Sequence, residues 1–229
     1  MTDLLTLVFD TETNGKRPKR AQLNQEPAIT QIAGVLFEGR RPVAHLSCFT
    51  HPVRFNGSPA PVPDPELNPN VELTEKDYEF FRNSGITEER IALVGRPLKT
   101  GLAEFNQMVK VADRIVAHNI QFDDPITRSN YARVAAPQQE YWNTPKYCTM
   151  KTLEPVLKLP GKYGFKFPTL DESYRALVDP MGFSGAHDAM VDVQACADVL
   201  WAVEDAIEAG DERFAGVSLW QLPENWPKE

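Results

Sequence analysis

The sequence has few cysteines, no long apolar run and fewer basic than acidic residues. Its three cysteines, Cys48, Cys148 and Cys196, are odd in number and far apart, which argues against both a disulfide framework and a zinc site. We interpret them as mostly buried thiols. No segment approaches the roughly 20 apolar residues of a membrane span, and no basic leader precedes the strand-like pattern of Met1 to Asp10. We therefore expect a cytoplasmic protein with no membrane partner.

The charge balance disfavours a nucleic-acid partner at first reading. The net charge is −8 and the pI is about 5.1, whereas proteins that bind phosphate groups usually present a basic surface. A site that holds divalent cations among carboxylates is an exception, because the ions carry the positive charge. Other enzyme signatures are absent: there is no Gly-x-Ser-x-Gly elbow, and Gly161-Lys162 lacks the rest of a P-loop.

Local patterns indicate one α/β domain with a central mixed β-sheet flanked by α-helices. At 229 residues and 42% hydrophobic content, the chain can bury one full core. β-rich runs come first, and short strands then alternate with helical spacing. The predicted strands are 4–9, 29–37, 42–49, 114–117 and 147–150, and the predicted helices are 102–109, 122–134, one opening at a Thr169/Glu172 capping box, and about 188–208.

Two stretches lack periodicity. The polar, proline-rich segment 52–69 is predicted to be an irregular surface excursion. Residues 210–229 contain Trp220 and Trp226 without a repeating pattern. We therefore assign residues 1–209 to the domain and 210–229 to a C-terminal tail, which we expect to pack on the domain, with a docking segment as the alternative.

Three carboxylates stand at the ends of predicted strands. Asp10 and Glu12 follow the first apolar run, and residues two apart on a strand project from the same face. Asp123 follows His118 and Asn119 at the end of the fourth predicted strand. Each has an ordinary reading as well: the strand ends and the acid pair is solvated, or Asp123 is a helix N-cap.

Asp192 is more informative, because it lies on the apolar side of the last predicted helix. Its neighbours at helical spacing are small or apolar: Ala189, Ala195, Cys196 and Val199. A carboxylate on that side needs a cation, a hydrogen-bond donor or a metal ion, because burial of an isolated charge costs several kcal/mol. Oxygen ligands without a Cys or His cluster favour Mg²⁺ or Mn²⁺ over zinc.

Three ordered motifs resemble those of the DEDDh (DnaQ-like) exonucleases, which include the proofreading subunit of bacterial replicative polymerase and ribonuclease T. The motifs are Phe9-Asp10-Thr11-Glu12-Thr13, His118-Asn119-Ile120-Gln121-Phe122-Asp123, and Gly185-Ala186-His187-Asp188-Ala189-Met190-Val191-Asp192. The sister DEDDy group has a tyrosine where this chain has Asp188. The resemblance implies the ribonuclease H-like fold, which agrees with the predicted order of elements.

The resemblance also implies a function and a site. We expect a two-metal 3′-to-5′ exonuclease that releases nucleoside 5′-monophosphates from 3′ ends of single-stranded DNA, with a polymerase as a possible partner. Two Mg²⁺ ions, for which Mn²⁺ can substitute, would be held by Asp10, Glu12, Asp123 and Asp192. His187 would be the general base. The residues that correspond to contacts with the terminal nucleotide are Thr11, Thr13, Asn119 and Phe122. Asn14 departs from the threonine of many relatives.

Two basic clusters and two alternative functions stay open. Lys16, Arg17, Lys19 and Arg20 form one cluster, and Lys158, Lys162 and Lys166 form the other; each contacts phosphates or is simply a solvated surface. The first alternative function is trimming of RNA 3′ ends, because the acids and the histidine are indifferent to the sugar. The second is a non-catalytic, polymerase-associated adaptor, although no acidic ligand is missing.

Overall fold

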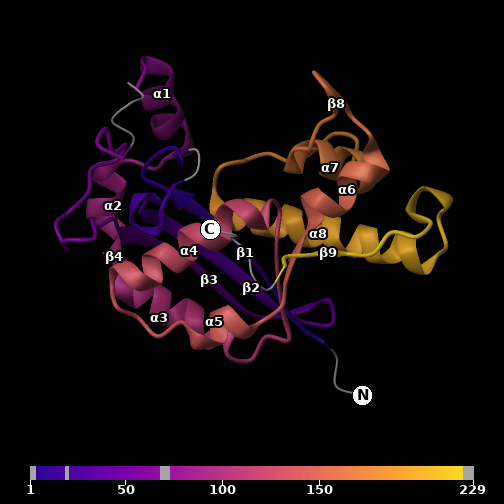
Figure 1. The fold of residues 1–229 in the computed structure, drawn as a ribbon, viewed down its shortest axis with the longest axis horizontal. Helices are drawn as coiled ribbons and strands as arrows, with labels where there is room; N and C mark the ends of the chain where they lie inside the picture. Colours follow the sequence, from indigo (N-terminus) through magenta and orange to yellow (C-terminus); the bar gives the residue numbers. More distant parts are fainter. Residues whose placement is uncertain (1–3, 19–20, 68–72, 224–229) are drawn as a thin grey trace.

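The computed structural model describes residues 4–18, 21–67 and 73–223. A seven-stranded sheet passes through the molecule in the order β4-β3-β2-β1-β5-β6-β9, and a separate hairpin consists of β7 and β8 (Figure 1). The strands are β1 (Leu5–Thr13), β2 (Ile29–Glu38), β3 (Arg41–His51), β4 (Arg96–Pro97), β5 (Arg114–Ala117), β6 (Lys146–Cys148), β7 (Pro160–Gly161), β8 (Gly164–Phe165) and β9 (Trp220–Gln221).

Helices pack on the sheet. α8 contacts β1 and β2, whereas α3 contacts β2 and β3. The helices are α1 (Glu75–Ser84), α2 (Glu88–Val94), α3 (Leu98–Val109), α4 (Ile120–Arg133), α5 (Gln139–Asn143), α6 (Thr149–Leu157), α7 (Leu170–Leu177) and α8 (Ala189–Glu208), with 3₁₀ turns η1 (Leu23–Gln25) and η2 (Glu212–Phe214).

The predicted opening meander is confirmed. β1 pairs antiparallel with β2, and β2 pairs antiparallel with β3, so the chain opens with a meander. β5 and β6 then add in parallel on the other side of β1. The sheet is therefore mixed, as predicted, and β1 is a central strand with neighbours on both sides.

The side chains of β1 alternate between two hydrophobic clusters, because successive residues of a strand point to opposite faces. Leu7 and Phe9 belong to the cluster that α3 and α4 cover. Val8 belongs to the cluster that α8 covers. Asp10 and Glu12 continue the series of Val8, so the alternation directs both carboxylates to the side of α8.

Several elements differ from the sequence prediction. The strand predicted at 147–150 ends at Cys148, because Cys148 caps α6: its Sγ accepts a hydrogen bond from the backbone N–H of Lys151 at 3.4 Å. The helix predicted from residue 122 begins at Ile120. Helices α1, α2, α5 and α6 were not predicted, although Thr74 and Asp77 form a capping box at the start of α1.

The structure also describes the cysteines and most of the C-terminal segment. All three cysteines are free and buried, as predicted. In the segment assigned to the tail, β9 pairs antiparallel with β6 through Trp220 and Cys148. Residues 224–229, which include Trp226, lie outside the described residues. Across the part of the chain that the structure describes, no helix combines the length and apolar character needed to cross a membrane.

Candidate active site

The end of β1 brings two carboxylates next to α8. Asp10 pairs with Ala33 and Glu12 pairs with Gln31 in the register with β2. On the other side of β1, the described pairing with β5 stops at Val8 and Val116. The carboxylates therefore lie just beyond the point where the parallel strands stop pairing, the edge at which α/β sheets commonly bind their ligands.

Asp123 reaches the same region from α4. Asn119 is the N-cap of α4 and has φ 73°, a left-handed conformation that turns the chain sharply from β5 into the helix. Asp123 follows in the first turn. Its Oδ1 accepts hydrogen bonds from Thr11 on β1, at 2.8 Å from the hydroxyl and 3.2 Å from the backbone N–H. Thr11 thereby fixes the Asp123 carboxylate against β1.

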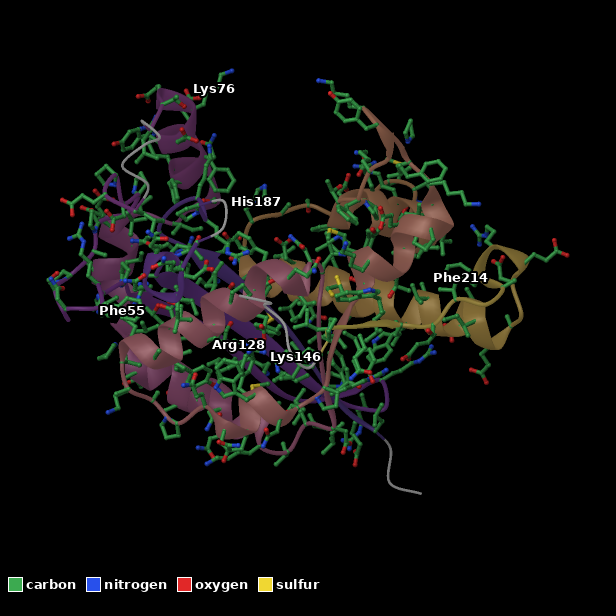
Figure 2. The ribbon with its side chains drawn as sticks, viewed as in Figure 1. Phe55, Lys76, Arg128, Lys146, His187 and Phe214 are labelled. Carbon is green, nitrogen blue, oxygen red and sulfur yellow. The ribbon has the colours of Figure 1, made fainter. Side chains whose placement is uncertain are left out.

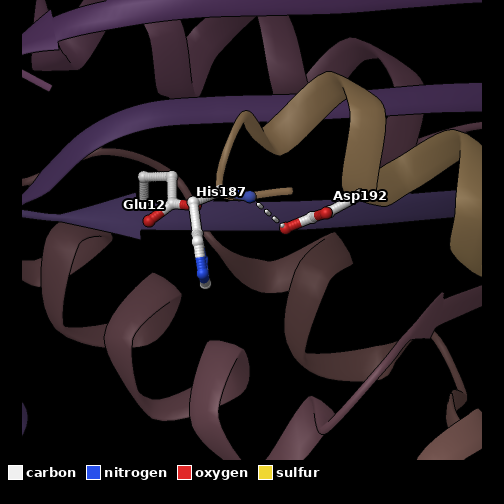
Figure 3. Close-up of side chains that lie close together, drawn as sticks. All are labelled: Glu12, His187 and Asp192. Carbon is white, nitrogen blue, oxygen red and sulfur yellow. Dashed lines mark hydrogen bonds between the residues drawn. The ribbon is translucent and has the colours of Figure 1, made fainter. Parts of the chain in front are cut away.

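The first turn of α8 supplies Asp192. Asp188 caps this helix by accepting a hydrogen bond from the backbone N–H of Met190 at 3.0 Å. Asp192 Oδ2 accepts one from the backbone N–H of His187 at 3.2 Å, and Figure 3 shows the imidazole of His187 directed away from that bond. His187 has φ 72°, so its backbone is held in the left-handed region just before the helix begins.

Burial, and then the like charges of neighbouring carboxylates, raise the pKa values of the acids at this site. Burial and then the charges of Asp123, Glu12 and Asp192 raise the pKa of Asp10 well above its ordinary range. Burial and then Asp192 and Asp123 raise the pKa of Glu12 to about 8. Burial likewise raises the pKa of Asp123 to about 7 and raises that of Asp192. The four acids cannot all ionise at neutral pH without a compensating cation.

The donor set fits a divalent metal ion. Single ligand atoms of Glu12, His187 and Asp192 all lie within 4.8 Å of one another. Asp192 Oδ1 is buried and has no hydrogen-bond partner within the described part of the chain. No lysine or arginine of residues 4–18, 21–67 or 73–223 forms an ion pair with these acids. Hard carboxylate oxygens without a thiolate suit Mg²⁺ or Mn²⁺.

A cavity of about 860 Å³ opens beside the acids. Every residue predicted to contact a terminal nucleotide lines it, and so do all four acidic residues and His187. The predicted nucleotide-contact residues are Thr11, Thr13, Asn119 and Phe122. The structure therefore brings together all of the residues that the motifs singled out.

Sequence reasoning missed two walls of this cavity. α1 contributes Phe80, whose ring lies 4.9 Å from the ring of His187, edge to face. His118 holds the opposite wall: its Nδ1 lies 2.8 Å from the Thr149 hydroxyl, and its Nε2 lies 3.0 Å from the carbonyl oxygen of Pro168. Burial lowers the pKa of His118 to about 4, so it is a neutral structural group here. The Thr74/Asp77 capping box was the available signal for α1.

Comparison with known proteins identifies the fold. No protein-family model matches the sequence, and no curated protein is significantly similar to it. Solved structures do match: exonuclease I of E. coli in complex with a dT13 oligonucleotide aligns over 92% of this chain with a TM-score of 0.67 and 18% identity. The moderately thermophilic exonuclease I of Methylocaldum szegediense aligns over 93%, with a TM-score of 0.63 and 19% identity. This is the ribonuclease H-like fold.

The predicted fold class and the resemblance to DnaQ-like exonucleases are thereby confirmed at the level of the fold. A zinc-bound form of the E. coli enzyme with single-stranded DNA also aligns, over 93% of this chain, with a TM-score of 0.61 and 16% identity. The chain spans less than half the length of these exonucleases, since it covers 43%, 42% and 42% of them.

Within this ribonuclease H-like fold, the first basic cluster is partly used for ion pairs. Lys16 pairs with Asp77 of α1, and Arg17 pairs with the buried Glu26, with Nε 2.6 Å from Oε2. Lys19 and Arg20 lie outside the described residues. The role of the cluster in phosphate binding stays a prediction.

The departure at Asn14 has a structural reason. The Asn14 side chain is buried, and its Oδ1 accepts a hydrogen bond from the backbone N–H of Ala28 at 2.8 Å. Its Nδ2 donates to the carbonyl oxygen of Pro61 at 3.1 Å. Asn14 therefore joins two loops and does not line the cavity.

The raised pKa values lead to a pH-dependent effect of Mg²⁺ on stability. Glu12 and Asp123 have ordinary pKa values of 4.5 and 3.8 and folded values of about 8 and about 7, so the folded metal-free protein binds more protons than the unfolded chain. Their contribution to stability is present below about pH 4 and is lost as the pH rises through 7 to 8. Binding of Mg²⁺ requires the ionised forms, so it offsets this loss.

We expect saturating MgCl₂ to raise the Tm by about 5 °C at pH 8 and by much less at pH 5.5. Thermal unfolding followed by circular dichroism, with EDTA or MgCl₂ at each pH, measures both shifts. Equal shifts at the two pH values would show that the acids do not form the ion site.

Proposed function

We propose that this chain is a divalent-metal-dependent 3′-to-5′ exonuclease that hydrolyses phosphodiester bonds at the 3′ ends of single-stranded DNA and releases nucleoside 5′-monophosphates. The observation that supports this most directly is the convergence of four carboxylates and His187 on one cavity. Asp10 and Glu12 come from β1, Asp123 from α4 and Asp192 from α8. The solved structures that share the fold are exonucleases, and two of those named above contain single-stranded DNA.

The residues have distinct roles in this proposal. Asp10, Glu12, Asp123 and Asp192 hold two Mg²⁺ ions, with Mn²⁺ as a substitute. Such ions neutralise charge on the phosphoryl group, activate the attacking water and stabilise the leaving 3′ oxygen. Thr11 keeps Asp123 oriented through its two hydrogen bonds. This orientation limits the movement of one carboxylate during turnover.

His187 is the general base in this proposal. Its ring is exposed at the cavity and is held by the backbone bond to Asp192 and the contact with Phe80. An imidazole is the side chain most often used as a general base and can accept a proton from the attacking water. In the view of Figure 2, His187 lies between α1 and the β7–β8 hairpin.

The cavity volume suits the end of a polynucleotide chain. About 860 Å³ is within the range of sites for small molecules and leaves room for a terminal nucleotide. Thr11, Thr13, Asn119 and Phe122 contact that nucleotide in the proposal. DNA is the preferred substrate because the third motif is most similar to the proofreading members of the family that the chain resembles. A polymerase partner, implied by the same resemblance, stays a prediction.

Digestion of end-labelled oligomers tests the proposal. A 5′-labelled single-stranded DNA oligomer and its RNA counterpart would be incubated with MgCl₂, with MnCl₂ and with EDTA. We expect a ladder that shortens from the 3′ end, requires metal and is faster on DNA. Faster cleavage of RNA would assign the chain to RNA trimming, and no cleavage with either metal would favour the adaptor function.

A further inference from the structure

The β7–β8 hairpin exposes aromatic side chains that the fold does not use. Lys162 and Tyr163 form its turn, between the paired residues Gly161 and Gly164. Tyr163 is 91% exposed and Phe165 is 58% exposed. Large aromatic rings stabilise a fold when they are buried, so two neighbouring exposed rings indicate a binding surface.

The hairpin continues directly from the wall of the cavity. Phe167 lines the cavity and is 43% exposed, and Pro168 and Thr169 line it as well. His118 holds Pro168 in place through its carbonyl oxygen. The pairing of the hairpin extends toward this wall, because the backbone N–H of Lys166 donates to the carbonyl oxygen of Leu159 at 2.9 Å. Figure 1 shows the hairpin projecting from the body on the side opposite α1.

Lysines alternate with the aromatic rings along this segment. Residues two apart on an extended chain point to the same side. Phe165 and Phe167 are therefore expected on one side and Lys166 on the other. The Nζ of Lys162 lies 5.1 Å from the centre of the Tyr163 ring. Lys166 pairs with Glu172. Lys158 and Lys162 make no ion pair in the part of the chain that is described.

Exposed aromatic rings with lysines beside them suit single-stranded nucleic acid. Single-stranded nucleic acid is bound by cations along its backbone and by aromatic rings on which its bases stack. The net charge of the chain is −8, so an exposed segment with several lysines and few carboxylates differs in charge from the chain as a whole. The hairpin continues from the cavity wall at Phe167, so it is within reach of the next nucleotides of a strand whose 3′ end lies in the cavity.

We propose that the β7–β8 hairpin binds the single strand upstream of the scissile end, with bases on Tyr163 and Phe165 and phosphates near Lys158 and Lys162. The proposal rests on the proposed function, because it assumes that the 3′ end enters the cavity. It adds a second contact region that only substrates longer than a few nucleotides reach. The hairpin therefore makes the enzyme prefer long substrates over short ones.

Binding and length dependence test this proposal separately from the chemistry. Fluorescence anisotropy in EDTA gives the Kd for a labelled DNA oligomer of about 12 nucleotides, a length within the usual range of single-strand sites. For the double variant Tyr163→Ala/Phe165→Ala we expect this Kd to rise about fivefold or more. The KM advantage of the 12-mer over a trinucleotide is expected to shrink by a similar factor.

Matched variants give the controls. Tyr163→Phe keeps the ring and is expected to leave the Kd unchanged, whereas Tyr163→Leu removes the ring and is expected to raise the Kd. Lys158→Ala/Lys162→Ala is expected to lower the slope of log Kd against log salt concentration by about 1.4, because each of the two lost phosphate contacts contributes about 0.7 to that slope. Lys99→Ala, at an exposed position of α3, removes a lysine far from the hairpin and is expected to change neither quantity.

The outcomes separate the two proposals. An unchanged Kd for Tyr163→Ala/Phe165→Ala overturns the hairpin proposal even if the chain digests DNA. Hairpin-dependent binding without digestion in either metal supports single-strand binding by the hairpin and overturns the exonuclease proposal. Loss of binding in Tyr163→Phe as well would overturn stacking as the mode of contact.

Discussion

Replacing Asp10 with asparagine is expected to reduce the rate of DNA digestion about 10³-fold or more, while it raises the Tm of the metal-free protein at pH 8. The rate falls because a metal ligand is worth several kcal/mol to the transition state, and each 1.36 kcal/mol is tenfold in rate. The Tm rises because burial and the like charges of neighbouring acids oppose ionisation of Asp10, whereas an asparagine side chain does not ionise.

Two measurements check this prediction, namely the initial rate on a single-stranded DNA oligomer and thermal unfolding in EDTA. Glu208→Gln is the matched control, because it removes an exposed carboxylate at the far end of α8 and is expected to change neither value. A variant that loses both activity and stability would mean that Asp10 is structural. A variant with normal activity would remove Asp10 from the metal site.

Replacing His187 with asparagine is expected to lower kcat by about 10²- to 10⁴-fold, the usual contribution of a general base. Asparagine is the appropriate replacement, because it tolerates the left-handed backbone that His187 adopts at φ 72°. It thereby keeps the backbone hydrogen bond to Asp192 while it removes the imidazole. We expect little change in KM, because the ring acts in the transition state and not in holding the substrate.

Steady-state kinetics of His187→Asn and of His45→Asn test this assignment. His45 lies at an exposed position of β3 and is expected to be dispensable. The pH dependence of the residual activity adds a second readout, since loss of a general base removes the acidic limb of the profile. A loss smaller than tenfold would mean that another group or bulk water accepts the proton.

The elements that the sequence predicted best are those whose apolar pattern is set by burial. The apolar residues of β1 and β2 indicate buried strands, and the alternation of β1 predicts that Asp10 and Glu12 lie on one face, as the structure shows. Asp192 was recognised because its helical neighbours are apolar, and the structure buries Ala189 and Cys196 beside it. A charge on the buried side of a helix is informative without any knowledge of its partners.

Local signals were weaker for the short elements. The strand predicted through Met150 ends at Cys148, because a cap formed by a thiol is outside the usual set of capping residues. α1 was missed because its apolar positions are few, and Phe81 is its only buried apolar residue. Phe80 therefore could not be placed against His187 in advance.

Local residue patterns in the sequence by themselves predicted the main strands and helices in their order along the chain, because burial and strand alternation set those patterns. The resemblance carried by three motifs implied the ribonuclease H-like class and the set of acids. Only the tertiary structure decided which groups meet. The bond from Thr11 to Asp123, the wall held by His118 and the position of the hairpin beside the cavity join residues far apart in the chain. Such contacts depend on how α1, α4, α8 and the hairpin pack around β1, and no local pattern encodes that packing.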